Sequence, residues 1–146
     1  MVHGVILGIG LDLVSVAEFR RIAESTARFR ERVFRGEEIE FCSSRADPWP
    51  CLAARFAAKE AVMKALGTGW SQRVDFADIV ILGGGERAPQ VRLSGEAAAR
   101  VQALGGRVHL SLTHAGGFAA AFAIVEQRSD PESPGSADLA FPRESR

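Results

Sequence analysis

An aspartate inside an apolar segment near the N-terminus is the first candidate for chemistry. Asp12 lies between Leu11 and Leu13, within residues 5–14, which are otherwise apolar or glycine. An unpaired carboxylate in a buried strand is costly, so Asp12 should be protonated, hydrogen-bonded or bound to a cation. The alternative is a structural aspartate at the end of the strand that accepts backbone N–H bonds from the next turn.

Charged residues inside an alanine-rich segment, residues 52–66, are the second candidate. At helical spacing, large apolar side chains gather on one side of this segment and alanines cover most of the other, which predicts a buried helix. Glu60 and Lys64 nevertheless share one face at a spacing of four residues. An exposed ion pair worth about 0.3–0.5 kcal/mol is the alternative. Because no polar face surrounds the pair, the pattern favours a functional role.

One carboxylate from a strand and one from a buried helix are suited to bind magnesium. Mg²⁺ is usually held by one or two carboxylates together with water and substrate phosphates, which makes Asp12 and Glu60 candidate ligands. Lys64 would then face the phosphates. The backbone amides of residues 67–69 are a weaker candidate for phosphate contacts. His114 ends a strand before a glycine turn, where it would point at a ligand or make a structural hydrogen bond.

Strands and helices that must position these residues alternate along the chain. Apolar or alternating segments predict strands at residues 5–14, 78–82, 89–93, 108–113 and 118–125. The alanines of the last segment are equally compatible with a helix. Helical spacing and cap signals predict helices from about Ser15 to Ser25, from 28 to 44 in one or two pieces, from 52 to 66, and from Ser94 to about Gly105.

Local signals set several boundaries of these elements. Ser15 and Glu18 have the spacing of a capping box, and Ser94 is expected to cap its helix. The prolines of residues 47–50 are expected to interrupt the helical region. Glycine turns are expected after residue 82 and at residues 116–117.

The composition is that of one soluble globular domain, and the mixed order of strands and helices predicts an α+β fold. Of 146 residues, 47% are hydrophobic and 25% charged, and 18 basic residues balance 18 acidic ones. Zero net charge argues against a nucleic-acid-binding protein. No run approaches the ~20 apolar residues of a membrane helix, and the N-terminus lacks the features of a signal peptide.

The two cysteines and the C-terminal segment complete this picture. Cys42 and Cys51 lie nine residues apart and match no metal-binding spacing, so we expect two reduced, partly buried thiols in a cytoplasmic protein. From Gln127 onward Ser, Pro, Asp, Glu and Arg dominate. We therefore expect a domain at residues 1–126 and a flexible polar tail at residues 127–146.

Three segments in order along the chain carry a family resemblance. Residues 10–13 (GLDL), 55–65 (RFAAKEAVMKA) and 109–114 (HLSLTH) resemble the three signatures of the bacterial holo-acyl-carrier-protein synthases, the small single-domain 4′-phosphopantetheinyl transferases. The resemblance spans about residues 7–126. It implies the fold of that family, a mostly antiparallel sheet packed on a long buried helix. It also implies a homotrimer with active sites at subunit interfaces.

The resemblance also implies roles for individual residues. Asp12 and Glu60 match the family's magnesium ligands, which hold the diphosphate of coenzyme A through the metal. Lys64 matches a lysine that contacts the phosphates and assists the leaving group. The remaining matches are to residues that bind the coenzyme or lie beside it: Lys59, Gly67, Thr68 and His114.

One position departs from the family pattern. Where the family has an arginine thought to meet the carrier protein, six residues after the metal aspartate, this chain has Glu18. Arg20, Arg21 and Arg28 are candidates to take over that role. Residues 20–35 hold six arginines against two glutamates, which suits an acidic carrier-protein helix. The alternative for each arginine is the solvated face of an amphipathic helix.

The activity that the resemblance implies is transfer of 4′-phosphopantetheine from coenzyme A to a serine of apo acyl-carrier protein. It would depend on Mg²⁺, release 3′,5′-ADP and serve fatty acid or polyketide synthesis. Glu60, Asp12 or a metal-bound water are open alternatives for the proton acceptor. Two other functions stay open, a non-catalytic module that binds carrier protein or coenzyme A and a metal-dependent phosphohydrolase.

Overall fold

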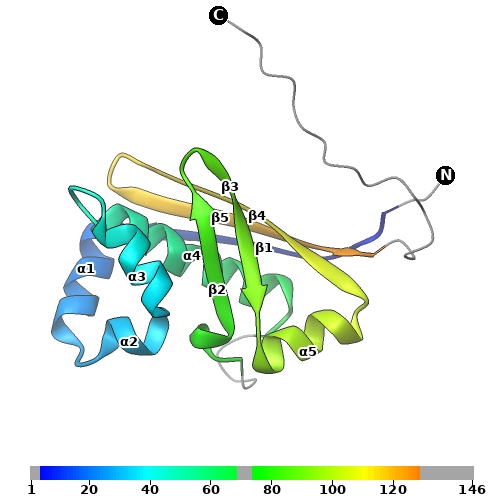
Figure 1. The fold of residues 1–146 in the computed structure, drawn as a ribbon. Coiled ribbons are helices and arrows are strands. Elements are labelled where there is room, and N and C mark those ends of the chain that lie inside the picture. The colour runs from blue at the N-terminus through cyan, green and yellow to red at the C-terminus, as the bar shows by residue number, and fades with distance from the viewer. Residues whose placement is uncertain (1–3, 69–73, 129–146) are drawn as a thin grey trace, which may run out of the picture.

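The computed structural model describes residues 4–68 and 74–128, and these form one α+β unit (Figure 1). The strands are β1 (Ile6–Ser15), β2 (Ile79–Gly84), β3 (Arg87–Leu93), β4 (Gly106–Ala115) and β5 (Phe118–Gln127). The helices are α1 (Val16–Ser25), α2 (Phe29–Val33), α3 (Gly36–Ser43), α4 (Trp49–Ala65), the short 3₁₀ helix η1 (Phe76–Asp78) and α5 (Gly95–Ala103).

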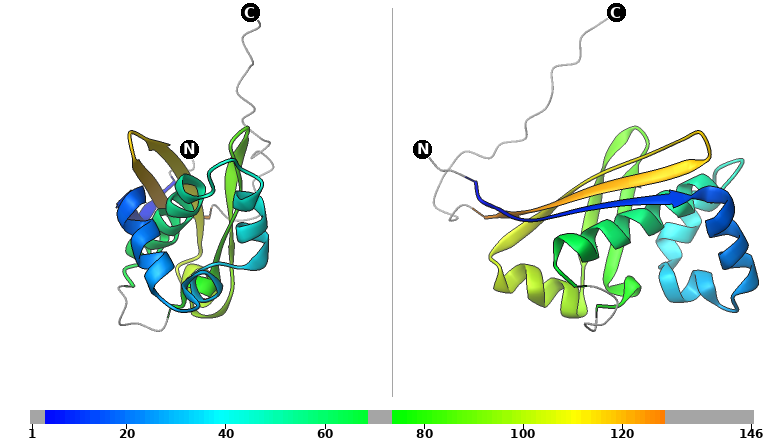
Figure 2. Two further views of the ribbon diagram at one scale, coloured as in Figure 1. Left: turned by 90° about the vertical axis from the view of Figure 1, so that its left-hand side faces the viewer. Right: turned by 180° about the vertical axis from the view of Figure 1, so that it is seen from behind.

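The strands form two antiparallel sheets around α4. One sheet has the order β1-β5-β4, and β2 and β3 form a separate hairpin. Helix α4 lies between the three-stranded sheet and the hairpin, with α1, α2 and α3 at one end and α5 at the other (Figure 2). The long helix is thus buried, and the predicted fold class is confirmed.

Two glycines let β1 approach the α4 backbone closely. A Cβ atom on Gly8 would lie 1.9 Å from the carbonyl oxygen of Ala65, and one on Gly10 would lie 1.8 Å from that of Ala61. Side chains alternate along a strand, so Asp12 points to the same side of β1 as these glycines. The glycines therefore bring Asp12 to the surface of α4.

Gly10→Ala is expected to lower the free energy of unfolding by about 1–3 kcal/mol, because the methyl group overpacks a backbone contact. Gly36→Ala is the matched control, since no atom lies within 4 Å of the added Cβ at the start of α3. That control is expected to leave stability unchanged or raise it by up to about 1 kcal/mol. Thermal unfolding at one protein concentration compares the two variants, and equal melting temperatures would contradict the close-approach argument.

The helices start and end close to the predicted positions, with one early start. Helix α4 begins at Trp49, three residues before the expected residue 52, because Pro50 occupies the first turn, where no backbone N–H is required. The expected helical region 28–44 is two helices, α2 and α3. The side chain of Ser15 accepts the N–H of Glu18 at 3.4 Å, as expected for a cap.

Two boundary predictions need correction. Ser94 makes no side-chain cap bond to α5, and its hydroxyl lies 3.4 Å from Asp78 Oδ1. Strand β5 includes Gln127, and Arg128 donates its N–H to Gly105, so the described unit extends past the expected limit at residue 126. The rest of the expected tail, residues 129–146, lies outside the described residues.

The prediction of two reduced cysteines is wrong. Cys42 near the end of α3 and Cys51 near the start of α4 form a disulfide, with their Cα atoms 5.5 Å apart. The chain reverses direction between the two helices, which brings positions nine residues apart into contact. Among the residues that the structure describes, no helix is long and apolar enough to cross a membrane.

Candidate active site

Asp12 and Lys64 join β1 to α4. The Lys64 ammonium donates to Asp12 Oδ1 and to the carbonyl oxygen of Leu11, both at 2.9 Å. The Asp12 side chain is largely buried, whereas that of Lys64 is about half exposed. The aspartate therefore has a cation beside it, one of the three outcomes expected from its sequence context. The lysine remains accessible to solvent and to a ligand.

Glu60 lies at the same crossing of β1 and α4. It directly precedes Ala61, whose carbonyl oxygen faces Gly10, and it lies one helical turn before Lys64. Its side chain is half-buried. The packing of β1 on α4 thus joins the strand carboxylate to the lysine that sequence analysis selected, with Glu60 on the neighbouring turn of the helix.

The donor set at this crossing fits a hard divalent cation. Asp12 and Glu60 supply carboxylate oxygens, which Mg²⁺ prefers, and water and phosphate oxygens usually complete its coordination. No group of three or more histidine, cysteine, aspartate and glutamate side chains suited to a metal occurs among the described residues. A metal held here would therefore rely on the two carboxylates and on oxygens from a phosphate ligand and water.

Lys59 lies elsewhere, inside the protein. Its side chain and that of Glu38 are both 0% exposed, and their charged atoms lie 2.8 Å apart. Lys59 also donates to the carbonyl oxygen of Phe76 at 3.0 Å, while Glu38 accepts the backbone N–H groups of Arg35 and Ile81. Burial lowers the pKa of Lys59, and Glu38 opposes that shift. In this conformation the ammonium is not available for the predicted coenzyme contact.

Gly67 and Thr68 close the C-terminal end of α4. Gly67 has φ of +68°, and its N–H donates to the carbonyl oxygen of Lys64. The hydroxyl and N–H of Thr68 both donate to Met63, at 3.2 and 3.0 Å, and Thr68 is buried. Thr68 thus stabilises the helix end, whereas Gly67 is exposed. The other candidate of this loop, Gly69, lies outside the described residues.

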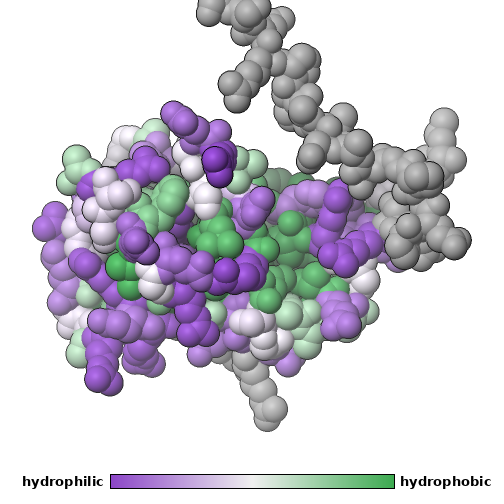
Figure 3. Space-filling model, in the orientation of Figure 1, coloured by the Kyte–Doolittle hydropathy of each residue, from purple (hydrophilic) through white to green (hydrophobic). Residues whose placement is uncertain are grey.

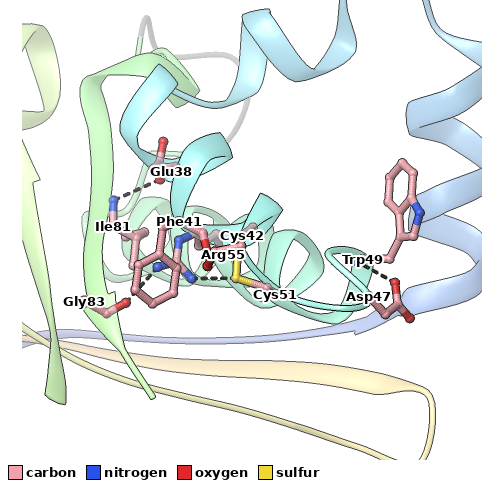
Figure 4. The surroundings of a disulfide bond; sticks show 10 residues. Glu38, Phe41, Cys42, Asp47, Trp49, Cys51, Arg55, Ile81 and Gly83 are labelled. Carbon is pink, nitrogen blue, oxygen red and sulfur yellow. Dashed lines mark hydrogen bonds between the residues drawn. A yellow bond between two sulfur atoms is a disulfide. The ribbon is translucent and has the colours of Figure 1, made fainter. Parts of the chain in front are cut away.

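His114 lines a cavity of about 220 Å³ between β4, α4 and the β2–β3 turn. Two arginines, Arg45 and Arg55, line the same cavity together with Cys51 of the disulfide. Arg55 donates to the carbonyl oxygen of Gly83 at 2.7 Å and to Cys51 Sγ at 3.2 Å (Figure 4). A cationic cavity of this kind is suited to anionic groups.

The two cavity arginines were not among the predicted site residues. Arg55 is 2% exposed, its Nε is buried without a hydrogen-bond partner among the described residues, and burial lowers its pKa. The ring of Phe41 packs against both guanidinium groups. The one available signal was a charged residue, Arg55, among the alanines and apolar residues at the start of the long helix. Nothing in the sequence separates Arg45 from the many exposed arginines.

The arginine-rich end of the molecule includes the predicted docking residues, and hydrophilic side chains dominate its surface over α1 and α2 (Figure 3). Arg20 pairs with Glu24 at 3.0 Å, and Arg21 lies 3.7 Å from Glu18. Both arginines are more than half exposed and so remain available to a partner. Arg28 precedes α2 in a left-handed conformation with φ of 57°.

Comparison with known proteins places this geometry in a family. The family described as the 4′-phosphopantetheinyl transferase superfamily matches residues 8–123. A holo-[acyl-carrier-protein] synthase of Anaeromyxobacter dehalogenans is 48% identical over 126 residues, which cover 83% of this chain and 96% of the relative. One of Desulforudis audaxviator is 48% identical over 130 residues, covering 87% and 98%.

Solved structures agree with these relatives. A synthase–coenzyme A complex from Chronobacterium ammoniagenes superposes with a TM-score of 0.71 at 28% identity, covering 84% of this chain and 98% of that one. The Bacillus anthracis holo-(acyl-carrier-protein) synthase in complex with CoA (3′,5′-ADP) gives a TM-score of 0.69 at 30% identity, covering 84% and 98%. The chain therefore belongs to the 4′-phosphopantetheinyl transferase superfamily, among the holo-[acyl-carrier-protein] synthases.

Proposed function

We propose that this chain transfers 4′-phosphopantetheine from coenzyme A to a serine of an apo acyl-carrier protein and releases 3′,5′-ADP. The observation that carries the proposal is the crossing of β1 and α4, where Asp12 and Lys64 are in contact and Glu60 lies one turn away. The family membership and the coenzyme-bound relatives support the substrate. Fatty acid or polyketide synthesis and a cytoplasmic location stay predictions.

The residues at the crossing would act mainly by position and charge. Asp12 and Glu60 would hold Mg²⁺, which when bound neutralises charge on the coenzyme diphosphate. Lys64 is exposed enough to leave Asp12 and donate to the phosphate oxygens of the departing 3′,5′-ADP. The serine hydroxyl then needs only alignment with the pantetheine-side phosphorus, because phosphoryl transfer depends largely on positioning and electrostatic stabilisation.

The cavity beside His114 would hold another part of the coenzyme. Coenzyme A carries a 3′-phosphate as well as its diphosphate, and Arg45 and Arg55 supply positive charge in this cavity. His114 would add a hydrogen bond there, which keeps its predicted role near the coenzyme. Gly67 would offer its exposed backbone beside the bound coenzyme.

The outer face of the three-stranded sheet supports a homotrimer. Side chains that point away from α4 form an exposed apolar surface, called here the outer face: Ile9, Leu11, Leu13, Phe118 and Phe122. Contiguous apolar patches of this kind mark interaction sites in soluble proteins. A second copy of the chain is the expected partner, and active sites would then lie at subunit boundaries.

Phe122→Glu is expected to break this assembly, because it places a charge in the middle of the outer face. Light scattering after gel filtration should show a mass near one chain, 15.7 kDa, instead of three. Leu104→Glu is the matched control, since Leu104 is 43% exposed against 41% for Phe122 but follows α5. A Phe122→Glu protein with the mass of the unchanged protein would refute the proposed interface.

The carrier protein would dock on the arginine-rich end. Arg20, Arg21 and Arg28 are the candidates there, and a basic patch speeds encounter with an acidic partner more than it tightens binding. Glu18, which replaces the arginine of the family pattern, pairs with Arg21 within α1. The arginine-rich end remains net basic, because residues 20–35 hold six arginines against two glutamates.

Mass spectrometry of the carrier protein tests the proposed function. The purified chain is mixed with apo acyl-carrier protein, coenzyme A and Mg²⁺, with a chelator control. A gain of one phosphopantetheine that is lost with the chelator supports the transferase. An unchanged carrier with intact coenzyme A points to a binding module, and cleaved coenzyme A beside an unchanged carrier points to a phosphohydrolase.

A further inference from the structure

The Cys42–Cys51 disulfide borders the cationic cavity. Cys42 is 0% exposed, whereas Cys51 is partly exposed and lines the cavity with Arg45 and Arg55. The bond closes the segment between α3 and α4, which contains Arg45. Both cysteines of the chain are used in this bond. Disulfides in reducing compartments are usually catalytic or redox-sensing. The Cys42–Cys51 bond is therefore a candidate for a response to redox conditions.

The disulfide also contacts one of the two cavity cations. Arg55 Nη1 lies 3.2 Å from Cys51 Sγ, and its Nη2 is held by the carbonyl oxygen of Gly83 (Figure 4). The guanidinium group is therefore fixed between the disulfide and the β2–β3 turn. A change in the charge of the Cys51 sulfur acts directly on Arg55, and loss of the bond releases the segment that carries Arg45.

We propose that Cys42 and Cys51 form a thiol–disulfide exchange site that controls the affinity of the cationic cavity for the phosphates of the coenzyme. The proposal rests on the proposed function, because the ligand is the adenosine end of coenzyme A. The oxidised form is the tight-binding form. The reductant is a dithiol, either a small molecule or the active-site pair of a dithiol protein.

The exchange begins at the accessible sulfur. A thiolate of the dithiol attacks Cys51 Sγ, the Cys42–Cys51 bond breaks, and Cys42 leaves as a thiolate that takes up a proton. The second thiol of the dithiol then displaces Cys51 and closes its own disulfide. Two electrons pass from the dithiol to the cysteine pair, and two thiols remain on the enzyme.

Reduction weakens phosphate binding for two physical reasons. A thiolate at reduced Cys51 places negative charge against Arg55, 3.2 Å away in the oxidised protein, and offsets its attraction for phosphate. The segment that carries Arg45 also gains conformational freedom, which raises the entropic cost of arranging the cavity around a ligand. Both effects have the same sign.

Calorimetric titration of the full-length protein with 3′,5′-ADP tests the proposal, because this ligand has no thiol that would itself reduce the bond. Titrations are run after equilibration with oxidised or reduced dithiothreitol, and alkylation followed by mass spectrometry counts the free thiols in each sample. We expect the reduced protein to bind 3′,5′-ADP about tenfold more weakly, because the positive charge of Arg55 would be largely neutralised.

Cysteine variants separate the two physical reasons. Cys42→Ser leaves the Cys51 thiol beside Arg55 and is expected to bind as weakly as the reduced protein in either buffer. Cys51→Ser also lacks the bond but puts no thiol beside Arg55, so it is expected to bind more tightly than Cys42→Ser and to ignore the buffer. Circular dichroism confirms that both variants are folded.

Several outcomes would overturn the proposal. Equal affinity of the oxidised and reduced proteins for 3′,5′-ADP, with zero and two free thiols respectively, would refute the redox control. Such a result would not contradict the proposed coenzyme site. Two free thiols after oxidation mean that the bond does not form. Absence of 3′,5′-ADP binding in both states rejects the redox site together with the coenzyme site, a result that carrier-protein modification checks independently.

Discussion

Asp12→Asn and Glu60→Gln are each expected to reduce phosphopantetheine transfer by at least about 10³-fold while leaving the fold intact. Each substitution keeps the size of the side chain and removes the negative charge that a divalent cation requires. The close packing of β1 on α4 depends on Gly8 and Gly10, and the Asp12–Lys64 pair that also links them is half exposed at the lysine, so stability should change little. Carrier mass gain with time measures the rate, and thermal unfolding checks the fold.

A matched carboxylate outside the site separates charge removal in general from loss of the metal ligands. Glu96→Gln removes the carboxylate of an ion pair with Arg100 on α5, formed at 3.1 Å and distant in sequence from the crossing. This control should retain normal transfer. The magnesium dependence gives a second readout, because residual activity of Asp12→Asn should require a higher Mg²⁺ concentration. Near-normal turnover of either site variant in magnesium would remove the metal-site assignment.

The local sequence predicted the elements of the active site well. Apolar, alternating and alanine-rich segments set the strands and the long helix, because side-chain periodicity reflects which face is buried. The link between Asp12 and Lys64 spans 52 residues, and sequence signals selected both residues without showing that they meet. The small size of Gly8 and Gly10 was visible, but that each faces a helix carbonyl is a property of the packed structure.

Other features could not be predicted because they depend on contacts between distant segments. The family resemblance placed Lys59 beside the coenzyme, yet Glu38 from α3 pairs with it inside the core. The cysteines have no motif spacing, and only the reversal between α3 and α4 brings them together. Arg55 became a cavity residue because Gly83 of β2 supplies a carbonyl oxygen to its guanidinium group. In each case a residue from another helix or strand determines what the side chain does in the folded protein.

Lys59→Met is expected to lower the free energy of unfolding by about 3–5 kcal/mol, because it leaves the Glu38 carboxylate buried without its cation. Such a loss is a large share of the roughly 5–15 kcal/mol that stabilises a typical domain. Denaturant unfolding at fixed protein concentration measures it. Arg100→Met, which breaks the partly exposed ion pair with Glu96, is the control and should cost no more than about 1 kcal/mol.

A double variant and a kinetic measurement decide between a structural Lys59 and the coenzyme-binding Lys59 that the family resemblance implied. Adding Glu38→Gln to Lys59→Met removes the stranded charge, and the amide oxygen can still accept one of the N–H groups of Arg35 and Ile81, so the double variant should be more stable than Lys59→Met alone. If the pair is structural, folded Lys59→Met keeps its KM for coenzyme A. Unchanged stability with a strongly raised KM would instead place the Lys59 ammonium at the coenzyme. The buried position of both charges, joined to α4, α3, β2 and η1 by hydrogen bonds, favours the first result.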